Sequence, residues 1–244
     1  MTQPHPGDRH AQTHEHDDRP DRAQTKTRTQ TPTTVRTRVL VLTALLIVCA
    51  AGMGLDWALR GPDGELVRTV APSTAGTWGV DRAAGVLVIL LGLVAVAVGW
   101  RALRSGIHRA ALAVSAAVGV VAAYAASEGL KAAVASDRVR RDITSVDCPA
   151  PGDWGFPSNH TVVAVAGATA ILLLVPGWPP AAGWAVVALA TGAGAGRVLQ
   201  GVHAPHEAVA GALLGAAVVL AVVLLLTPVV ERLGRGLSTR RHAR

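Results

Sequence analysis

Two histidines and one carboxylate in this sequence have the types and spacing that nucleophilic catalysis requires. His203 and Glu207 are four residues apart, which is the spacing of neighbours on one face of a helix. A carboxylate placed there holds one imidazole nitrogen and leaves the other free to attack phosphorus. His160 can protonate the leaving oxygen in such a reaction. The pattern suggests phosphoryl transfer, with His203, His160 and Glu207 as candidate catalytic residues.

Cations and a helix start could bind the phosphate that this reaction needs. Lys131 and Arg138 are seven residues apart and share one face if the helix persists that far. Guanidinium groups match phosphate oxygens in bidentate geometry, and cations stabilise a phosphoryl group in transfer. The free N–H groups at a helix start also favour an anion. The predicted phosphate-binding residues are Lys131, Arg138, Ser158, Asn159 and Arg197, and the scheme needs no metal or other cofactor.

The elements that must position these residues have the composition of membrane-spanning helices. Half of the 244 residues are hydrophobic, only 16% are charged, and the mean hydropathy is +0.38. The charges are clustered between apolar runs, and about 20 apolar residues in a helix can cross the hydrocarbon. We therefore expect an all-α fold, an integral membrane bundle of six transmembrane helices. The expected helices are Val39–Leu59, Ala83–Trp100, Ala110–Val134, Ser158–Val175, Ala181–Gly196 and Ala208–Val230.

The expected transmembrane domain covers residues 39–230, with polar segments around it. Residues 1–38 are rich in Thr, Gln, His, Asp and Arg without apolar periodicity, which predicts a disordered polar tail. Residues 231–244 are expected to form a basic tail, and residues 60–82 and 135–157 to form loops on the side of the candidate site.

Basic flanks indicate the orientation of the bundle. Cytoplasmic segments of membrane proteins carry an excess of Lys and Arg, and three flanks of this chain do so. With six helices these flanks share one side, so both termini are expected in the cytoplasm and the site on the extracytoplasmic face of the cell membrane. The net charge of +7 belongs to these flanks and does not indicate a nucleic-acid partner, because no aromatic stripe accompanies it. The basic residues are Lys26, Arg28, Arg36 and Arg38; Arg101, Arg104 and Arg109; and Arg232, Arg235, Arg240, Arg241 and Arg244.

The candidate residues also form a pattern with a known counterpart. Its parts are Lys131-x6-Arg138, "PSNH" at 157–160, and Arg197-x5-His203-x3-Glu207. Each part alone is weak, but the combined spacing is specific. The pattern resembles the three-part signature of the type 2 phosphatidic acid phosphatase superfamily, which also includes vanadium haloperoxidases and bacterial acid phosphatases. The resemblance covers about residues 83–225.

The resemblance implies a role for each matched residue and a class of substrate. The resemblance implies that a six-helix membrane protein of this kind removes phosphate from lipid phosphates or isoprenoid diphosphates. A phosphorylated lipid in the membrane is therefore the implied substrate. The implied roles are phosphate binding for Lys131, Arg138, Ser158 and Arg197, the phosphohistidine for His203, the acid for His160, and the partner of His203 for Glu207.

The sequence departs from the family pattern at four positions. Val139 stands where a Pro is usual, Asn159 where a Gly is usual, and Gly196 where a Ser is usual. Glu207 replaces the usual Asp, which keeps the carboxylate but lengthens its reach by one methylene. The last departure matters most, because it bears directly on the position of His203.

Other interpretations of the same residues stay open. Ser158 could be an ordinary N-cap, and Lys131 an interfacial residue whose ammonium reaches water. A catalytically silent membrane protein that binds or transports phosphorylated lipids would keep the phosphate site and lose turnover. A metal or haem protein would use His160, His203 and His206. Small residues on the helix faces would also permit a homodimer.

Overall fold

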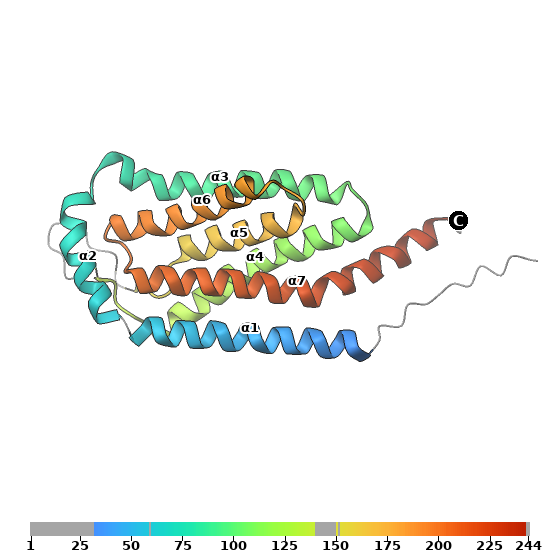
Figure 1. Ribbon diagram of the computed structural model, residues 1–244, viewed down its shortest axis with the longest axis horizontal. Coiled ribbons are helices and arrows are strands. Elements are labelled where there is room, and N and C mark those ends of the chain that lie inside the picture. Colours follow the sequence, from blue (N-terminus) through green and yellow to red (C-terminus); the bar gives the residue numbers. More distant parts are fainter. Residues whose placement is uncertain (1–31, 59, 140–149, 151, 243–244) are drawn as a thin grey trace, which may run out of the picture.

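The computed structural model describes residues 32–58, 60–139, 150 and 152–242, and within them the chain forms helices and no strands. Figure 1 shows a chain that folds back and forth along one long axis. The helices are α1 (Pro32–Ala58), α2 (Arg60–Thr74), α3 (Trp78–Leu103), α4 (Ile107–Val134), α5 (Asn159–Leu174), α6 (Pro180–Leu199) and α7 (Pro205–His242).

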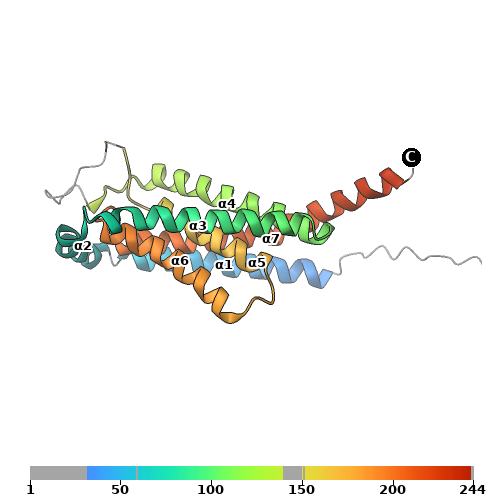
Figure 2. The same cartoon turned by 90° about the horizontal axis from the view of Figure 1, so that it is seen from above.

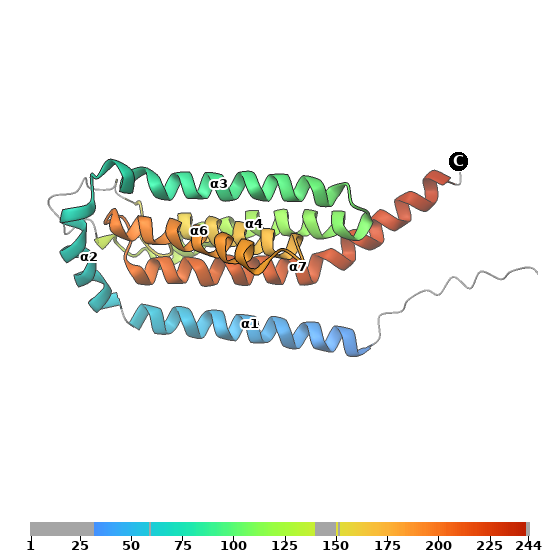
Figure 3. The same ribbon diagram turned by 45° about the horizontal axis from the view of Figure 1, so that its top comes forward.

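The helices form a bundle with one distinct end. α1 and α3 to α7 run along the long axis, whereas α2 lies across the end where α1 stops and α3 begins (Figures 1 and 3). The link between α6 and α7 and the C-terminal end of α4 lie at that same end (Figure 1). Every predicted site residue lies in or near the last turn of α4 or α6, or the first turn of α5 or α7. The fold therefore gathers these residues at the α2 end of the bundle.

α5 lies at the centre of the bundle and packs on both sides (Figure 2). One buried cluster joins it to α4 and α7 and includes Val162 and Val219. A second cluster joins it to α3 and α6 and includes Ile171 and Ala193. The start of α5, which carries part of the predicted site, is therefore fixed by neighbours on all of these helices.

Glycines on α7 allow α5 to approach closely. A methyl group on the Cα of Gly211 would lie 2.7 Å from the carbonyl oxygen of Ser158, and one on Gly215 would lie 2.6 Å from that of Val162. Such distances are far inside van der Waals contact, so only glycine fits at these positions. The close crossing brings Ser158 against the first turns of α7.

α5 is shorter than α4, and along the bundle axis its first residue lies deeper in the bundle than the C-terminal end of α4. α5 has 16 residues and α4 has 28. Ser127 Oγ donates to Asn159 Oδ1 at 2.6 Å, so the first residue of α5 is level with Ser127. α4 continues to Val134, which places the start of α5 about 10 Å below the end of α4 at 1.5 Å per residue. At the opposite end, the Arg109 guanidinium donates to the carbonyl oxygen of Leu174.

The segment expected as a loop after α1 contains a helix instead. α2 spans Arg60–Thr74 despite a proline at position 72. Val67 and Ala71 of α2 are buried against Ala204, and Thr74 Oγ1 donates to the carbonyl oxygen of Leu199 at 2.5 Å. The prediction of a loop over 60–82 was wrong because this tertiary packing overrides a weak local propensity.

The terminal helices are longer than the expected boundaries at residues 39 and 230. α1 begins at Pro32, and proline is favoured in the first turn of a helix. α7 continues past Pro228 to His242, and Glu231 pairs with Arg235 one turn later and with His108 of α4 at 3.4 Å. These contacts extend the helix into the segment predicted as a tail. Residues 1–31 and 243–244 of the predicted tails lie outside the described residues.

Within the described residues, five helices are long and apolar enough to cross a membrane: Arg36–Ala58, Trp78–Leu103, Ile107–Val134, Pro180–Leu199 and Pro205–Thr239. α5 is apolar but shorter. The structure thus supports an all-α membrane protein, and the number of six spans stays a prediction that depends on α5.

Candidate active site

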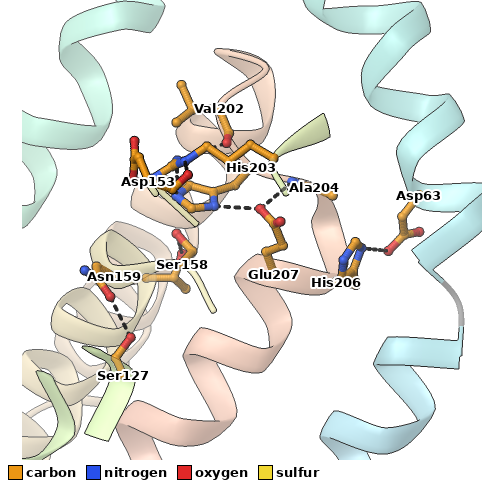
Figure 4. Close-up of polar contacts among 12 residues, drawn as sticks. Asp63, Ser127, Asp153, Ser158, Asn159, Val202, His203, Ala204, His206 and Glu207 are labelled. Carbon is orange, nitrogen blue, oxygen red and sulfur yellow. Dashed lines mark hydrogen bonds and ion pairs between the residues drawn. The ribbon is translucent and has the colours of Figure 1, made fainter. Parts of the chain in front are cut away.

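His203 and Glu207 form a buried, hydrogen-bonded pair at the start of α7 (Figure 4). His203 Nδ1 and Glu207 Oε2 are 2.7 Å apart, and each residue is 1% exposed. α7 begins at Pro205, so His203 precedes the helix and Glu207 lies in its first turn. Glu207 Oε2 also accepts the N–H of Ala204 at 3.2 Å, as the carboxylate of a capping box does. The four-residue spacing brings the imidazole and the carboxylate together.

The contacts of His203 determine which nitrogen carries the proton. Arg138 Nη1 lies 3.1 Å from His203 Nε2. Arginine can only donate, so Nε2 must be the acceptor and the proton must lie on Nδ1. Nδ1–H then donates to Glu207. The pair with Glu207 therefore leaves the lone pair of Nε2 on the side of the ring that faces Arg138.

Arg138 reaches this position from a loop and not from a helix. α4 ends at Val134, and Ala135 has the left-handed backbone conformation with φ of 47°. The expectation that Lys131 and Arg138 share one helix face was therefore wrong. Arg138 is instead held by the carbonyl oxygen of Val202 at 3.2 Å and by Asp153, whose Oδ1 accepts from Nη2 at 2.6 Å. These contacts aim its guanidinium at His203 without the helix.

Positive groups crowd around His203. Its pKa lies well below the ordinary value, first because the ring is buried and then because Arg138, Arg197, Lys131 and His160 lie near it. Lys131 is buried in the last turn of α4, and His160 is half-buried in the first turn of α5. His203 is therefore a neutral imidazole at neutral pH, the form in which it can act as a nucleophile.

Ser158 is completely buried against the start of α7. Its N–H donates to the carbonyl oxygen of Glu207 at 2.9 Å, and its side-chain oxygen accepts from Thr161 Oγ1 at 3.2 Å. Ser158 is the N-cap residue of α5, but its hydroxyl makes no capping hydrogen bond. The hydroxyl hydrogen is thus not engaged by the helix start.

The side chain of Asn159 turns toward α4 and away from His203 (Figure 4). Its amide oxygen accepts from Ser127 and its amide nitrogen donates to the Glu128 carboxylate. The structure does not bring this side chain together with the other predicted phosphate ligands, and any contact of Asn159 with phosphate would have to use its backbone N–H.

Arg197 lies in the last turn of α6, half-buried beneath the link to α7. Its Nη1 donates to Gln200 Oε1 at 2.7 Å, and Gln200 Nε2 donates to the carbonyl oxygen of Val80 on α3 at 2.8 Å. The N–H groups of Val202 and His203 both donate to the carbonyl oxygen of Arg197. The same residue thus contributes a cation to the site and fixes the turn that carries His203.

His206 faces the opposite direction from His203. Its ring stacks on Phe156, with centroids 6.3 Å apart, and meets the edge of Trp57 at the same distance. Asp63 on α2 lies 3.7 Å from Nδ1 (Figure 4). Among the described residues, no group of three or more His, Cys, Asp or Glu side chains could hold a metal ion, so His160, His203 and His206 do not form a metal site in this arrangement.

Three residues of the site were not identified from the sequence. Asp153 holds Arg138, Gln200 holds Arg197, and Gly155 lies against Glu207. An acid before the "PSNH" stretch and an amide three residues after Arg197 were visible signals for the first two. Nothing local marked Gly155, because its role depends on a contact with a residue far along the chain.

Comparison with known proteins identifies a family for the part of the chain that holds the candidate site. Residues 112–230 match the family model described as the PAP2 superfamily, whereas the curated proteins and the solved structures give no match. The matched range contains α5, α6 and much of α4 and α7, together with every predicted site residue, and it leaves α1 to α3 outside. Residues 112–230, the part of the chain that holds the candidate site, thus belong to the PAP2 superfamily, the superfamily of the type 2 phosphatidic acid phosphatases.

Proposed function

We propose that this protein is a metal-independent phosphatase that hydrolyses a lipid phosphate or an isoprenoid diphosphate through a phosphohistidine on His203. The observation that carries the proposal is the orientation of the His203 ring. Nδ1 is bound to the Glu207 carboxylate at 2.7 Å, and Nε2 faces the Arg138 guanidinium at 3.1 Å. A buried neutral imidazole oriented in this way, among cations, is suited to attack a phosphate group.

The phosphate would bind beside Nε2 and take over the contact that Arg138 now makes with it. When Arg138 Nη1 turns to a phosphate oxygen, the lone pair of Nε2 becomes free. Lys131 and Arg197 would neutralise the remaining oxygens. The Ser158 hydroxyl and the backbone N–H of Asn159 would add donors at the positive end of α5. These are the proposed phosphate-binding residues.

In the first chemical step, Nε2 attacks phosphorus and the bond from phosphorus to the leaving oxygen breaks. His160 gives its proton to that oxygen, so the lipid leaves as an alcohol, or as a monophosphate if the substrate is a diphosphate. The imidazole becomes positively charged when it is phosphorylated, and the Glu207 carboxylate at Nδ1–H stabilises this charge.

In the second step, water hydrolyses the phosphohistidine. His160, now neutral, removes a proton from the water as its oxygen attacks phosphorus. The bond between Nε2 and phosphorus breaks, inorganic phosphate leaves, and both histidines return to their starting states. Each atom and proton is accounted for by the substrate, one water and the two histidines.

An apolar cavity supports a lipid as the substrate. Its volume is about 480 Å³, and it lies between α3, α4 and α5, where small residues such as Gly99, Ala117 and Gly167 leave space. Val163 also lines it, three residues after His160 and therefore on the same face of α5. The lining follows α5 from Val163 to Leu174, so the cavity has room for a hydrocarbon chain that extends away from a head group beside His160.

The basic flanks support an extracytoplasmic site in the cell membrane. The start of α1 and the C-terminal part of α7 lie at the end of the bundle opposite to α2 (Figure 1). The last turn of α3 with Arg101, and the α3–α4 link with Arg104, lie at that same end. Because such basic segments stay in the cytoplasm, the α2 end with the site would face outward.

The test is phosphate release by the purified protein in detergent with excess EDTA. The substrates are isoprenoid diphosphates, isoprenoid monophosphates, phosphatidic acid and a soluble phosphate ester, and the control is His203→Gln. We expect release from lipid substrates that persists in EDTA and is lost in the variant. Acid-labile ³²P on the wild-type protein, absent from the variant, would identify the phosphohistidine.

Three other outcomes would contradict this proposal. Phosphate binding without release from any substrate would identify a silent lipid-phosphate-binding protein. Loss of release in EDTA would show that a metal takes part. Equal turnover of the soluble ester and the lipids would contradict the lipid preference.

A further inference from the structure

The backbone at Gly155 lies directly against the Glu207 carboxylate. A methyl group on the Cα of Gly155 would be 2.0 Å from Glu207 Oε1 and 2.8 Å from its Cδ. The three atoms nearest to that methyl position all belong to Glu207. Gly155 does not have a left-handed φ, so its backbone conformation is open to any residue. What excludes a side chain at position 155 is the carboxylate of Glu207.

Neither partner in this contact can move away freely. The N–H of Gly155 donates to the carbonyl oxygen of Ser136 at 2.9 Å, and Ser158 is tied to the backbone of Glu207 at 2.9 Å. The Glu207 carboxylate is held by His203 Nδ1 and by the N–H of Ala204. Both residues are buried. A side chain at position 155 would therefore displace the carboxylate from His203 before it displaced either backbone.

The length of Glu207 explains why this space is needed. The related family pattern has an aspartate at this position, and a glutamate extends the carboxylate by one methylene. In this chain Oε2 bonds to His203 while Oε1 occupies the space beside the Cα of Gly155. A shorter carboxylate at position 207 would leave that space empty.

We propose that Gly155 is a positioning residue for the His203–Glu207 pair: its missing side chain makes the space that a glutamate at position 207 requires. Residues 155 and 207 are thus coupled, so a side chain at 155 is tolerated only with a shorter carboxylate at 207. The inference about catalysis rests on the proposed function, whereas the steric coupling does not.

The test is a double-mutant cycle with Gly155→Ala, Glu207→Asp and the combination of the two. Gly129→Ala is the matched control, since it makes the same change on α4, where a methyl group meets no atom within 4 Å. Two quantities are measured for each purified protein: kcat/KM for the best lipid substrate of the panel above, and the midpoint of thermal unfolding in detergent.

We expect Gly155→Ala to lower kcat/KM by about 100-fold or more, because a displacement of about 1 Å at a catalytic group can cost that much. Glu207→Asp alone should lower it by about tenfold, because the carboxylate retreats from Nδ1 and leaves a void. Adding Gly155→Ala to Glu207→Asp should change kcat/KM by less than about threefold. The unfolding midpoint should follow the same pattern, with the double variant above Gly155→Ala. Gly129→Ala should keep the wild-type kcat/KM and should not lower the unfolding midpoint, since alanine is favoured over glycine inside a helix.

The result that would overturn the proposal is an equal loss from Gly155→Ala with Glu or Asp at position 207. Wild-type activity and unfolding midpoint in Gly155→Ala would overturn it as well. If Gly155→Ala does not fold, folding of the double variant supports the proposal and its failure to fold contradicts it. If the wild type hydrolyses no substrate, the proposed function fails, and the unfolding midpoints still decide the coupling.

Discussion

Two histidines of the "HAPHE" stretch at 203–207 each face a carboxylate, but the two pairs differ in every other respect. His203 Nδ1 is 2.7 Å from Glu207, which lies in the first turn of the helix that follows His203, and both residues are 1% exposed. His206 Nδ1 is 3.7 Å from Asp63 on α2, whose side chain is 25% exposed. The first pair is a hydrogen bond between two buried side chains, whereas the second is a longer contact between a buried imidazole and a partly exposed carboxylate.

Burial beside a carboxylate is common to both histidines, so it is not the feature on which the proposed role of His203 rests. Both rings are buried, at 1% and 4% exposed. The second nitrogen of His203 faces Arg138, where a phosphate could bind, whereas the ring of His206 is packed against Phe156 and Trp57. What distinguishes His203, the proposed nucleophile, is that its second nitrogen faces a guanidinium group and not aromatic rings. His206 instead connects α7 to α1 and α2.

The largest effect should come from removing the first imidazole. We expect His203→Gln to lower kcat by at least about 10⁴-fold, because the nucleophile itself is lost. The unfolding midpoint should change little, since glutamine has a similar volume and can still donate to Glu207. The measurement is phosphate release with saturating lipid substrate. A variant with more than one hundredth of the wild-type rate would assign the nucleophile to another residue.

The next effect tests the carboxylate of the same pair. Glu207→Gln keeps the length that fits beside Gly155 but removes the charge that stabilises the phosphorylated imidazole. We expect a loss in kcat of about 10³-fold, comparable to the loss when the carboxylate of a catalytic triad becomes an amide. Asp63→Asn is the matched change in the second pair and should leave kcat within about threefold. If the two variants had equal effects, the contrast between the pairs would be wrong.

The pH profile should separate His203 from an ordinary histidine. Its pKa lies well below 6.5 because of burial and the neighbouring cations, so the folded protein keeps it neutral as the pH falls through 6.5. After correction for substrate ionisation, kcat/KM should fall less between pH 7 and pH 5.5 than the roughly tenfold expected for an unshifted histidine nucleophile. An acid limb centred near pH 6.5 would contradict the lowered pKa.

The smallest effect is expected from the second imidazole. His206→Gln should leave kcat and KM within about threefold of the wild type, because His206 faces away from the phosphate site. Its unfolding midpoint should fall, since the stacking on Phe156 and the contact with Asp63 are lost. A large loss of kcat with an unchanged unfolding midpoint would place His206 in the reaction.

The sequence predicted those parts that depend on periodicity and short spacing. The apolar runs identified the spanning helices, and the four-residue spacing of His203 and Glu207 identified their contact. The family match over residues 112–230 confirms the superfamily that the resemblance predicted. These signals are local, so they can be recognised in the sequence without knowledge of the tertiary structure.

The parts that were missed depend on contacts between distant segments. α2 forms because Val67 and Ala71 find Ala204 to pack on, not because its sequence favours a helix. Arg138 reaches His203 from a loop because Asp153 holds it. Asn159 has the right position in the motif, but its side-chain amide bonds to Ser127 and Glu128 on α4 and does not turn toward His203.

The short central helix ties the site to the thickness of the bilayer. Because α5 begins about 10 Å below the end of α4, a lipid substrate of the proposed phosphatase would have to bring its head group down between the helix ends to reach His203. The surrounding bilayer matches the longer outer helices, such as α3 with 26 residues and α4 with 28, and not the enclosed α5. A thicker bilayer would raise the head-group plane further above the site, so the proposed function makes the local membrane thickness a variable that sets how often a lipid phosphate reaches His203.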